Sequence, residues 1–295
     1  MRVLVTGWPT FLHGEATAGD VLSMRGVASA LAEEGIAADT AWSPGFRPGA
    51  LHLDDADPAR YTHVVFTCGP AHGEQVSGLH ERYAGCRRIA VGVSVLDPAD
   101  PAAAGFHRVL ARDGGSRPYP DLSLSGGGTS VPVAGVVLAP GQREYGARRR
   151  HEQVHEALLD WASRLDCARV PLDTRLDGAD WRHCATADQF LSLIRRFDVI
   201  ITTRLHGLVL ALRAGVPALA VDPVAGGGKV AAQAEALDWP AVVPAETVTG
   251  SGGDAALGRW WEWCLSAGGR ERARHPAPLD GAHPLLTELL AEVRR

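Results

Sequence analysis

Residues 198–230 read DVIITTRLHGLVLALRAGVPALAVDPVAGGGKV, and this stretch decides the fold class. The apolar run DVIITT (198–203) is typical of a buried strand. LHGLVLALRAG (205–215) follows as an apolar helix, and VPALAVD (216–222) is typical of the next buried strand. A strand, a helix and a strand in direct succession predict a parallel sheet that is covered by helices.

The same alternation occurs on both sides of this stretch. Before it, we expect strands at 2–7, 62–70, 88–96, 133–141 and 168–173, and helices at 19–35, 148–166 and 186–197. Asp20 is the expected cap of the first helix, and Thr186 with Gln189 has the spacing of a capping box. After it, 259–267 is expected to be a packing helix and 283–295 a terminal helix.

A change of composition divides the chain into two halves. SLSGGGTSVP (123–132) is rich in serine, glycine and threonine, which is typical of a flexible connection. We therefore predict an α/β protein with two Rossmann-like domains that face a cleft, residues 1–128 and residues 129–295, the second carrying C-terminal helices.

Composition disfavours several classes of protein. The net charge of −5 and the absence of a long basic run disfavour a nucleic-acid-binding protein. Five cysteines without a C-x-x-C pair disfavour a disulfide framework or a cysteine-rich zinc site. No secretory h-region and no apolar run of membrane-spanning length is found, so we expect a cytoplasmic protein without a membrane span. No metal site is expected, and a weak Mg²⁺ requirement is left open.

Two cationic side chains interrupt the apolar stretch where the strand passes into the helix. Ligands of open parallel sheets bind beyond the carboxyl ends of the strands, and Arg204 and His206 come at that point. A helix N-terminus and an arginine fork both favour a phosphate or a carboxylate. The next strand leads through three glycines, which would let the backbone approach a ligand, to Lys229 at the expected start of another helix.

These residues predict a site for a small anion. Neighbouring strand ends would bring Arg204, His206 and Lys229 together. The glycine loop is not a Walker A motif, because its spacing differs and Val230 takes the place of Ser or Thr. The structural alternative is that His206 is a hydrogen-bonded core residue and Lys229 a solvated loop residue.

The stretch resembles the polysaccharide pyruvyl transferase family, whose members carry an S/T-x-R-x-H signature, an apolar helix ending in G-x-P, a strand and a Lys-Val pair. GVSVLD, VLARD and GDVLSMRGVASAL are similar to other regions of the family. The resemblance implies a GT-B-like fold and transfer of a pyruvyl group from phosphoenolpyruvate to sugar hydroxyls, giving a ketal and phosphate. It also implies that Arg204, Leu205, His206 and Lys229 line the phosphoenolpyruvate site.

The resemblance further implies roles for both halves. Residues 129–295 would bind phosphoenolpyruvate as co-substrate, without another cofactor, and residues 1–128 the saccharide acceptor. Arg143 is the first choice for a second donor-binding arginine and Arg148 the next, although Arg148, Arg149 and Arg150 are expected to be a solvated basic helix start. His206 could be an acid, a base or only a phosphate ligand, since histidine ordinarily titrates near neutral pH.

The N-terminal half departs from the family pattern. The family often has G-N-x-G-D-E after its first strand, whereas this chain has HGEATAGDV (13–21). Asp20 is either only a helix cap or a catalytic residue that acts on the acceptor, with His13 or Glu15 nearby. His72, after another strand, is a weaker candidate.

Two rival functions use the same pocket. One is a GT-B glycosyltransferase that uses a nucleotide-sugar, and the other is a non-catalytic sensor of phosphorylated metabolites. The identity of the acceptor and the oligomeric state, a homo-oligomer included, are left open.

Overall fold

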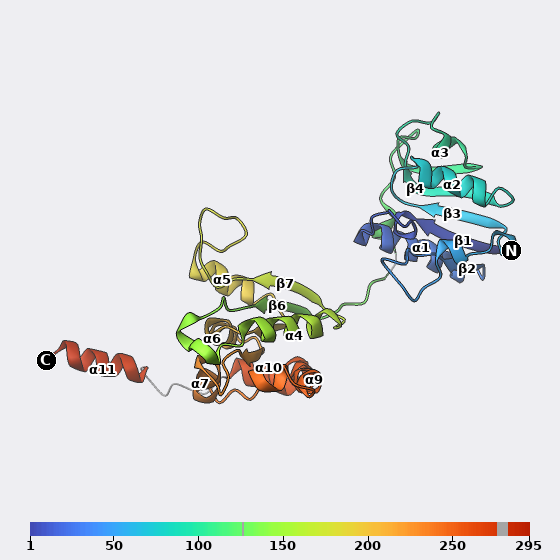
Figure 1. Ribbon diagram of the computed structural model, residues 1–295. Helices are drawn as coiled ribbons and strands as arrows, with labels where there is room; N and C mark the ends of the chain where they lie inside the picture. Colours follow the sequence, from blue (N-terminus) through green and yellow to red (C-terminus); the bar gives the residue numbers. More distant parts are fainter. Residues whose placement is uncertain (126, 276–282) are drawn as a thin grey trace. The chain divides into compact units, whose positions relative to one another are not determined.

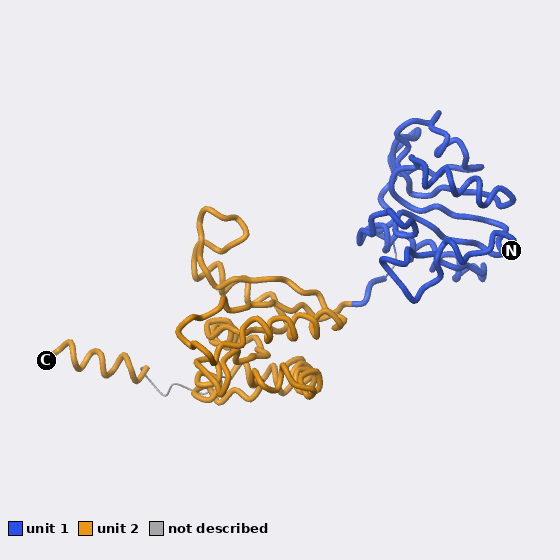
Figure 2. Tube along the Cα trace, viewed as in Figure 1, with its two compact units in different colours: residues 1–129 blue, residues 130–295 orange. Residues whose placement is uncertain are grey.

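The chain forms two compact units, residues 1–129 and 130–295 (Figure 2). The computed structural model describes residues 1–125, 127–275 and 283–295. Each unit contains its own parallel sheet flanked by helices (Figure 1), which confirms the predicted α/β class with two Rossmann-like halves. That the two halves face a cleft stays a prediction.

The first unit contains a five-stranded parallel sheet in the order β2-β1-β3-β4-β5. Its elements are β1 (Arg2–Gly7), α1 (Ala18–Glu33), β2 (Ala37–Thr40), β3 (His63–Thr67), α2 (Glu74–Arg82), β4 (Arg87–Ser94), α3 (Pro101–Ala104) and β5 (Arg108–Asp113). Alternate residues of β1 face opposite sides of the sheet: Val3 and Val5 pack with Met24 of α1, and Leu4 packs with Phe66 in the other core.

The predicted cap of α1 is wrong. The helix begins at Ala18, and its N-cap is Thr17, whose hydroxyl accepts a hydrogen bond from the N–H of Asp20 at 3.2 Å. Asp20 is the third residue of the helix, and its carboxylate accepts from the Thr17 hydroxyl at 2.6 Å. Thr17 is the cap because its hydroxyl reaches the otherwise unpaired N–H of the third helical residue, Asp20.

The second unit contains a parallel sheet in the order β10-β9-β8-β6-β7. Its elements are β6 (Val133–Val137), α4 (His151–Ser163), β7 (Ala168–Leu172), α5 (Ala187–Ile194), β8 (Val199–Thr202), α6 (Leu205–Arg213), β9 (Ala218–Asp222), α7 (Lys229–Ala236), β10 (Val242–Pro244), α8 (Ala245–Val248), α9 (Gly253–Leu265), α10 (Ala267–Arg274) and α11 (Pro284–Val293). The predicted capping box of Thr186 and Gln189 is present at the start of α5.

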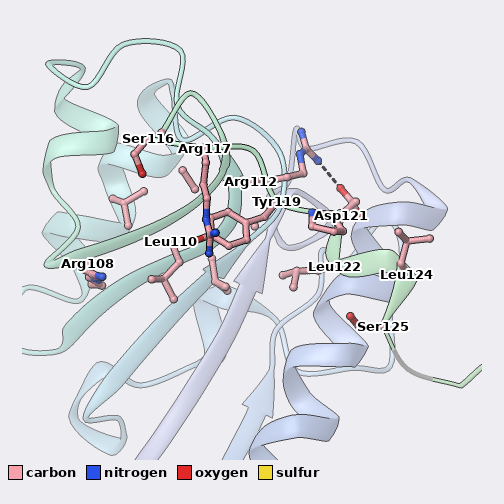
Figure 3. A pocket seen from close by; sticks show the side chains of 16 residues that line it. Arg108, Leu110, Arg112, Ser116, Arg117, Tyr119, Asp121, Leu122, Leu124 and Ser125 are labelled. Atoms are coloured by element: carbon pink, nitrogen blue, oxygen red, sulfur yellow. Dashed lines mark hydrogen bonds and ion pairs between the residues drawn. The ribbon is translucent and has the colours of Figure 1, made fainter.

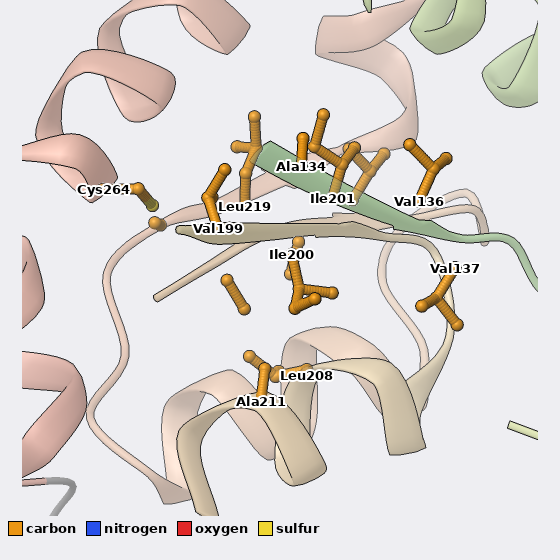
Figure 4. Packing of buried hydrophobic residues seen from close by; sticks show 14 of the residues in the cluster. Ala134, Val136, Val137, Val199, Ile200, Ile201, Leu208, Ala211, Leu219 and Cys264 are labelled. Carbon is orange, nitrogen blue, oxygen red and sulfur yellow. The ribbon is translucent and has the colours of Figure 1, made fainter. Parts of the chain in front are cut away.

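The core of the second unit lies on both faces of its sheet. Figure 4 shows Ile200 of β8 pointing towards Leu208 and Ala211 of α6, whereas Val199 and Ile201 point to the opposite face. All five side chains are fully buried. The near-continuous apolar run of β8 is explained by this burial on two sides.

The predicted helices at the end of the chain are present. In α9, Trp261 packs edge-to-face on Trp161 of α4 with ring centroids 6.1 Å apart, so this segment is a packing helix. In α11, Leu285 and Leu289 are exposed. The short strands β2 and β10 were not predicted, because three or four residues carry too little periodic signal.

Candidate functional site

Helix α6 begins at the carboxyl edge of the second sheet, the edge where its parallel strands end. Arg204 is the N-cap, with extended backbone at φ −113° and ψ 132°. The Thr202 hydroxyl holds this turn, because it donates to the carbonyl of Val137 at 2.9 Å and accepts from the N–H of Arg204 at 2.9 Å. A Cβ at Gly207 would lie 2.1 Å from that hydroxyl oxygen, so only glycine lets α6 approach the strands this closely.

The N-terminus of α6 offers free donors. Among the hydrogen bonds of the described residues, none comes from the backbone N–H of Leu205, His206 or Gly207. Arg204 makes no side-chain cap, and no acidic residue lies in the first turn. The helix dipole therefore acts here without a neutralising carboxylate at the cap, which favours an anion.

Arg204 has a partner that the sequence did not indicate. One nitrogen of its guanidinium donates to Asp173 Oδ1 at 2.8 Å, and the two side chains are 26% and 33% exposed. Asp173 directly follows β7, so Arg204 reaches past the end of β6 along the carboxyl edge. This ion pair fixes the direction of the guanidinium and leaves its other N–H groups for a ligand.

The glycine-rich loop after β9 contacts carboxylates of the protein. The N–H groups of Gly228 and Ala231 donate to Asp222 Oδ2 at 2.8 and 2.7 Å, and the N–H of Gly226 donates to Glu246 Oε1 at 2.8 Å. Gly226 has φ 74°, a conformation that favours glycine. Asp222 and Glu246 therefore take the N–H groups of Gly228 and Gly226, and the N–H of Gly227 donates to the carbonyl of Val224 at 2.9 Å. That the glycines let the backbone approach a ligand stays a prediction.

The other two residues that are predicted to bind the small anion also lie at the carboxyl edge of the second sheet. His206 is exposed in the first turn of α6, and Lys229 is half-buried as the first residue of α7. The strands β8 and β9, which lead to these helices, are hydrogen-bonded neighbours as predicted. Convergence of Arg204, His206 and Lys229 on one guest stays a prediction.

The arginines before α4 lie on an exposed 3₁₀ helix, Arg143–Arg148, with a kink at Gly146. Arg148 donates weakly to the carbonyl of Gly227 at 3.4 Å, and Arg149 lies 3.7 Å from Glu152. Arg148–Arg150 are exposed, in agreement with the expected solvated helix start. Arg143 is exposed as well, and its role stays a prediction.

His155 was not predicted from the sequence as a residue that supports this edge. Its Nε2 lies 3.0 Å from the hydroxyl of Thr203, which in turn accepts the N–H of Ala139 at 2.8 Å. This chain of contacts ties α4 to the residue that precedes Arg204. The available signal was the pair of histidines four residues apart, His151 and His155, which lie on one face of a helix.

In the first unit, Asp20 is half-buried, whereas His13 and Glu15 are exposed. The exposed His72, a weaker candidate, pairs through Nδ1 with Asp100 Oδ2. The other carboxylate oxygen of Asp100 accepts the N–H of Ala102 at 2.8 Å as the N-cap of α3. The backbone N–H of Ala102 and then the imidazole of His72 lower the pKa of Asp100.

A cavity of about 640 Å³ lies in the first unit beside β5 (Figure 3). Its lining includes Leu110, Tyr119 and Leu122, together with Arg117, whose guanidinium lies 4.5 Å from the centre of the Tyr119 ring. A second cavity, of about 420 Å³, lies between α4 and the strands β6 and β7. Neither lining contains the predicted site residues.

Within residues 1–125, 127–275 and 283–295, no helix is both long and apolar enough to cross a bilayer. Across the same ranges, no three His, Cys, Asp or Glu side chains gather as metal ligands.

The two parallel sheets and their helices define an α/β protein, and in its second unit two helices without side-chain caps begin at the carboxyl edge of the sheet. Residues 140–223 match the family model of the polysaccharide pyruvyl transferases, which confirms the resemblance over that segment. Arg143, Arg204, Leu205 and His206 lie inside the match, and Asp20 and Lys229 lie outside it. No curated protein matches the sequence.

Several solved structures are similar to the chain. Spinosyn rhamnosyltransferase SpnG with thymidine diphosphate has 12% identity and a TM-score of 0.29, with 100% of both chains covered. UDP-GlcNAc 2-epimerase from Methanocaldococcus jannaschii has 9% identity and a TM-score of 0.31, with 99% of this chain and 100% of that chain covered. E. coli heptosyltransferase WaaC with ADP has 15% identity and a TM-score of 0.28, with 89% and 99% covered.

Proposed function

We propose that the protein transfers a pyruvyl group from phosphoenolpyruvate to two hydroxyls of a saccharide, giving a pyruvate ketal and phosphate. The observation that carries this proposal is the N-terminus of α6, where free N–H groups lie between Arg204 and the exposed His206 inside the family-matched segment. The family supplies the reaction, and the local geometry supplies a reason for the donor to bind here.

The charge of the donor suits these residues. Phosphoenolpyruvate carries a phosphate and a carboxylate a few ångströms apart, so it needs several positive groups. Hydrogen bonds to charged groups contribute about 1.5–3 kcal/mol each. Two or three of them, from Arg204, Lys229 and the α6 amides, contribute about 3–9 kcal/mol before the cost of association, so the donor needs several such contacts at once to bind.

The chemistry needs proton transfer beside the bound phosphate. Protonation of C3 makes C2 electrophilic, a hydroxyl adds to C2, and phosphate leaves with the electron pair of its C–O bond. A second hydroxyl then closes the ketal, so one hydroxyl proton replaces the proton given to C3 and the other leaves with phosphate. We assign the proton transfer to His206 and stabilisation of the departing phosphate to Arg204 and Lys229.

The acceptor is proposed to bind in the first unit, with Asp20 as a catalytic candidate. The supporting observation is that Asp20 lies in the first turn of α1, directly beyond the loop that follows β1. Its hydrogen bond with Thr17 fixes the carboxylate at that edge.

Donor binding is the direct test. Thermal shift should show stabilisation by phosphoenolpyruvate and none by UDP or GDP, and phosphate should be released when a saccharide acceptor is added. Stabilisation by a nucleoside diphosphate alone would favour a glycosyltransferase. Binding of phosphoenolpyruvate without turnover over an acceptor panel would favour a sensor.

Variants locate the site. Arg204→Ala and Lys229→Ala should abolish donor binding while the fold survives, and Arg213→Ala, at the exposed other end of α6, should bind normally. His206→Ala should lose turnover more than affinity, whereas equal losses would make His206 a phosphate ligand only. Unchanged donor affinity in both Arg204→Ala and Lys229→Ala would refute the site.

A further inference from the structure

His151, the first residue of α4, is buried without a hydrogen-bond partner. Its side chain is 3% exposed, and neither ring nitrogen is hydrogen-bonded to any described residue. Buried polar side chains nearly always have a partner, and an orphaned one calls for an explanation. Two orphaned nitrogens on one imidazole indicate a group that is completed by a guest.

The position of His151 points to the carboxyl edge of the second sheet. The imidazole of His155, one helical turn further on, lies at Thr203, immediately past the end of β8. The rings of His151 and His155 are 6.1 Å apart. Because α4 follows β6 and runs back towards β7, His151 lies one turn further beyond the strand ends than His155 does.

The charges that act on His151 include one residue predicted to bind phosphoenolpyruvate, Lys229. Burial lowers the pKa of His151 most and the positive charge of Arg149 lowers it next; Asp222 and Glu144 raise it, and Lys229 lowers it least. Lys229 and Asp222 belong to the β9–α7 connection, so α4 and this connection face the same place. A neutral imidazole offers one N–H donor.

Helix α4 also begins with free donors. It has 13 residues, its N-cap Arg150 makes no side-chain cap, and none of the hydrogen bonds of the described residues comes from the N–H of His151, Glu152 or Gln153. Unlike α6, α4 has an acidic residue in its first turn, the exposed Glu152, whose carboxylate lies 3.7 Å from the guanidinium of Arg149. The strands β6 and β8 that precede α4 and α6 are neighbours. Two uncapped helix N-termini therefore follow neighbouring strands at one edge of the sheet.

We propose that His151 and the N-terminus of α4 form a carboxylate subsite, which holds the carboxylate of phosphoenolpyruvate while α6 and Arg204 hold its phosphate. This inference rests on the proposed function. A helix N-terminus and one neutral N–H suit a singly charged carboxylate, whereas the doubly charged phosphate needs the guanidinium.

The test compares two anions that differ by the carboxylate. Calorimetry measures binding of phosphoenolpyruvate and of methyl phosphate to the full chain and to its His151→Phe, His151→Gln and Arg204→Ala variants. His151→Phe keeps a buried ring but has no nitrogen. His151→Gln keeps an N–H donor, so it separates loss of the hydrogen bond from loss of the fold. His275→Phe makes the same exchange at an exposed position and is the matched control.

His151→Phe should weaken phosphoenolpyruvate binding about tenfold or more, the loss of one hydrogen bond to a charged group. Methyl phosphate should bind it as it binds the wild type, His151→Gln should fall between, and Arg204→Ala should lose both ligands. Unchanged phosphoenolpyruvate affinity in His151→Phe, or equal loss of both ligands, would overturn the subsite alone. A wild type that binds no phosphoenolpyruvate would overturn the proposed function and the subsite together.

Discussion

Asp222 supports the most quantitative prediction, because its carboxylate organises the connection that carries Lys229. The side chain is 1% exposed and accepts three backbone N–H groups, from Val224 at 3.0 Å, Gly228 at 2.8 Å and Ala231 at 2.7 Å. Asp222→Ala leaves all three donors without an acceptor. We therefore expect it to destabilise the second unit and to loosen the start of α7.

The magnitude follows from the three donors. An unsatisfied buried donor costs about 1–3 kcal/mol, and water entering the half-buried loop relieves part of that cost, so the loss is about 3–6 kcal/mol. With a urea m-value of about 2 kcal/mol/M, the midpoint falls by about 1.5–3 M. Asp222→Asn keeps one acceptor oxygen but turns an amide towards a donor, so its loss should be intermediate.

The assay is urea unfolding of the full chain followed by tryptophan fluorescence. Of the eight tryptophans, all except Trp8 and Trp42 lie in residues 130–295, so this signal reports mainly on the second unit. Phosphoenolpyruvate affinity should fall in parallel, because Lys229 loses its support. An Asp222→Ala protein that unfolds at the wild-type urea concentration would refute the reasoning.

Three further predictions concern stability. Gly207→Ala places a Cβ 2.1 Å from Thr202 Oγ1, so overpacking of about 1–3 kcal/mol should outweigh the better helix propensity and lower the melting temperature; an unchanged melting temperature would contradict this. Burial raises the pKa of the Cys264 thiol to about 12. The contribution of the protonated thiol to the free energy of unfolding is therefore complete below the unfolded pKa near 9, and it is lost by about 1.4 kcal/mol per pH unit as the pH rises to about 12. Urea titrations across this pH range should show a flatter fall in stability for Cys264→Ala than for the wild type. The Arg2 guanidinium, bound to Asp39 through two 2.7 Å hydrogen bonds, lowers the pKa of that carboxyl. The contribution of this ion pair to stability is therefore present above pH 3.8 and is lost below it. Acid unfolding followed by circular dichroism should be less steep for Asp39→Asn, and an identical acid profile would exclude the contribution.

The local elements were predictable where the signal was long and periodic. The strands β1, β3, β4, β6, β8 and β9 and the helices α1, α4, α5, α6 and α9 lie where apolar runs and helical periodicity placed them. Thr17 was missed as the cap of α1, because two residues with suitable side chains lie three positions apart and only the chain path decides between them. The sequence identified Arg204 but not its partner Asp173, which follows β7 and lies 31 residues earlier in the chain, because only the strand order brings the two side chains together.

The sequence by itself determined that this is a parallel α/β protein and that cations and helix starts gather at one edge of the second sheet. Apolar periodicity and turn residues are local, so they can be read without knowledge of the partners. Only the tertiary structure decided that Asp222 and Glu246 accept N–H groups of the glycine loop, that Asp173 orients Arg204 and that His151 is buried without a partner among the described residues. These facts depend on strand order and side-chain packing between segments that are distant along the chain.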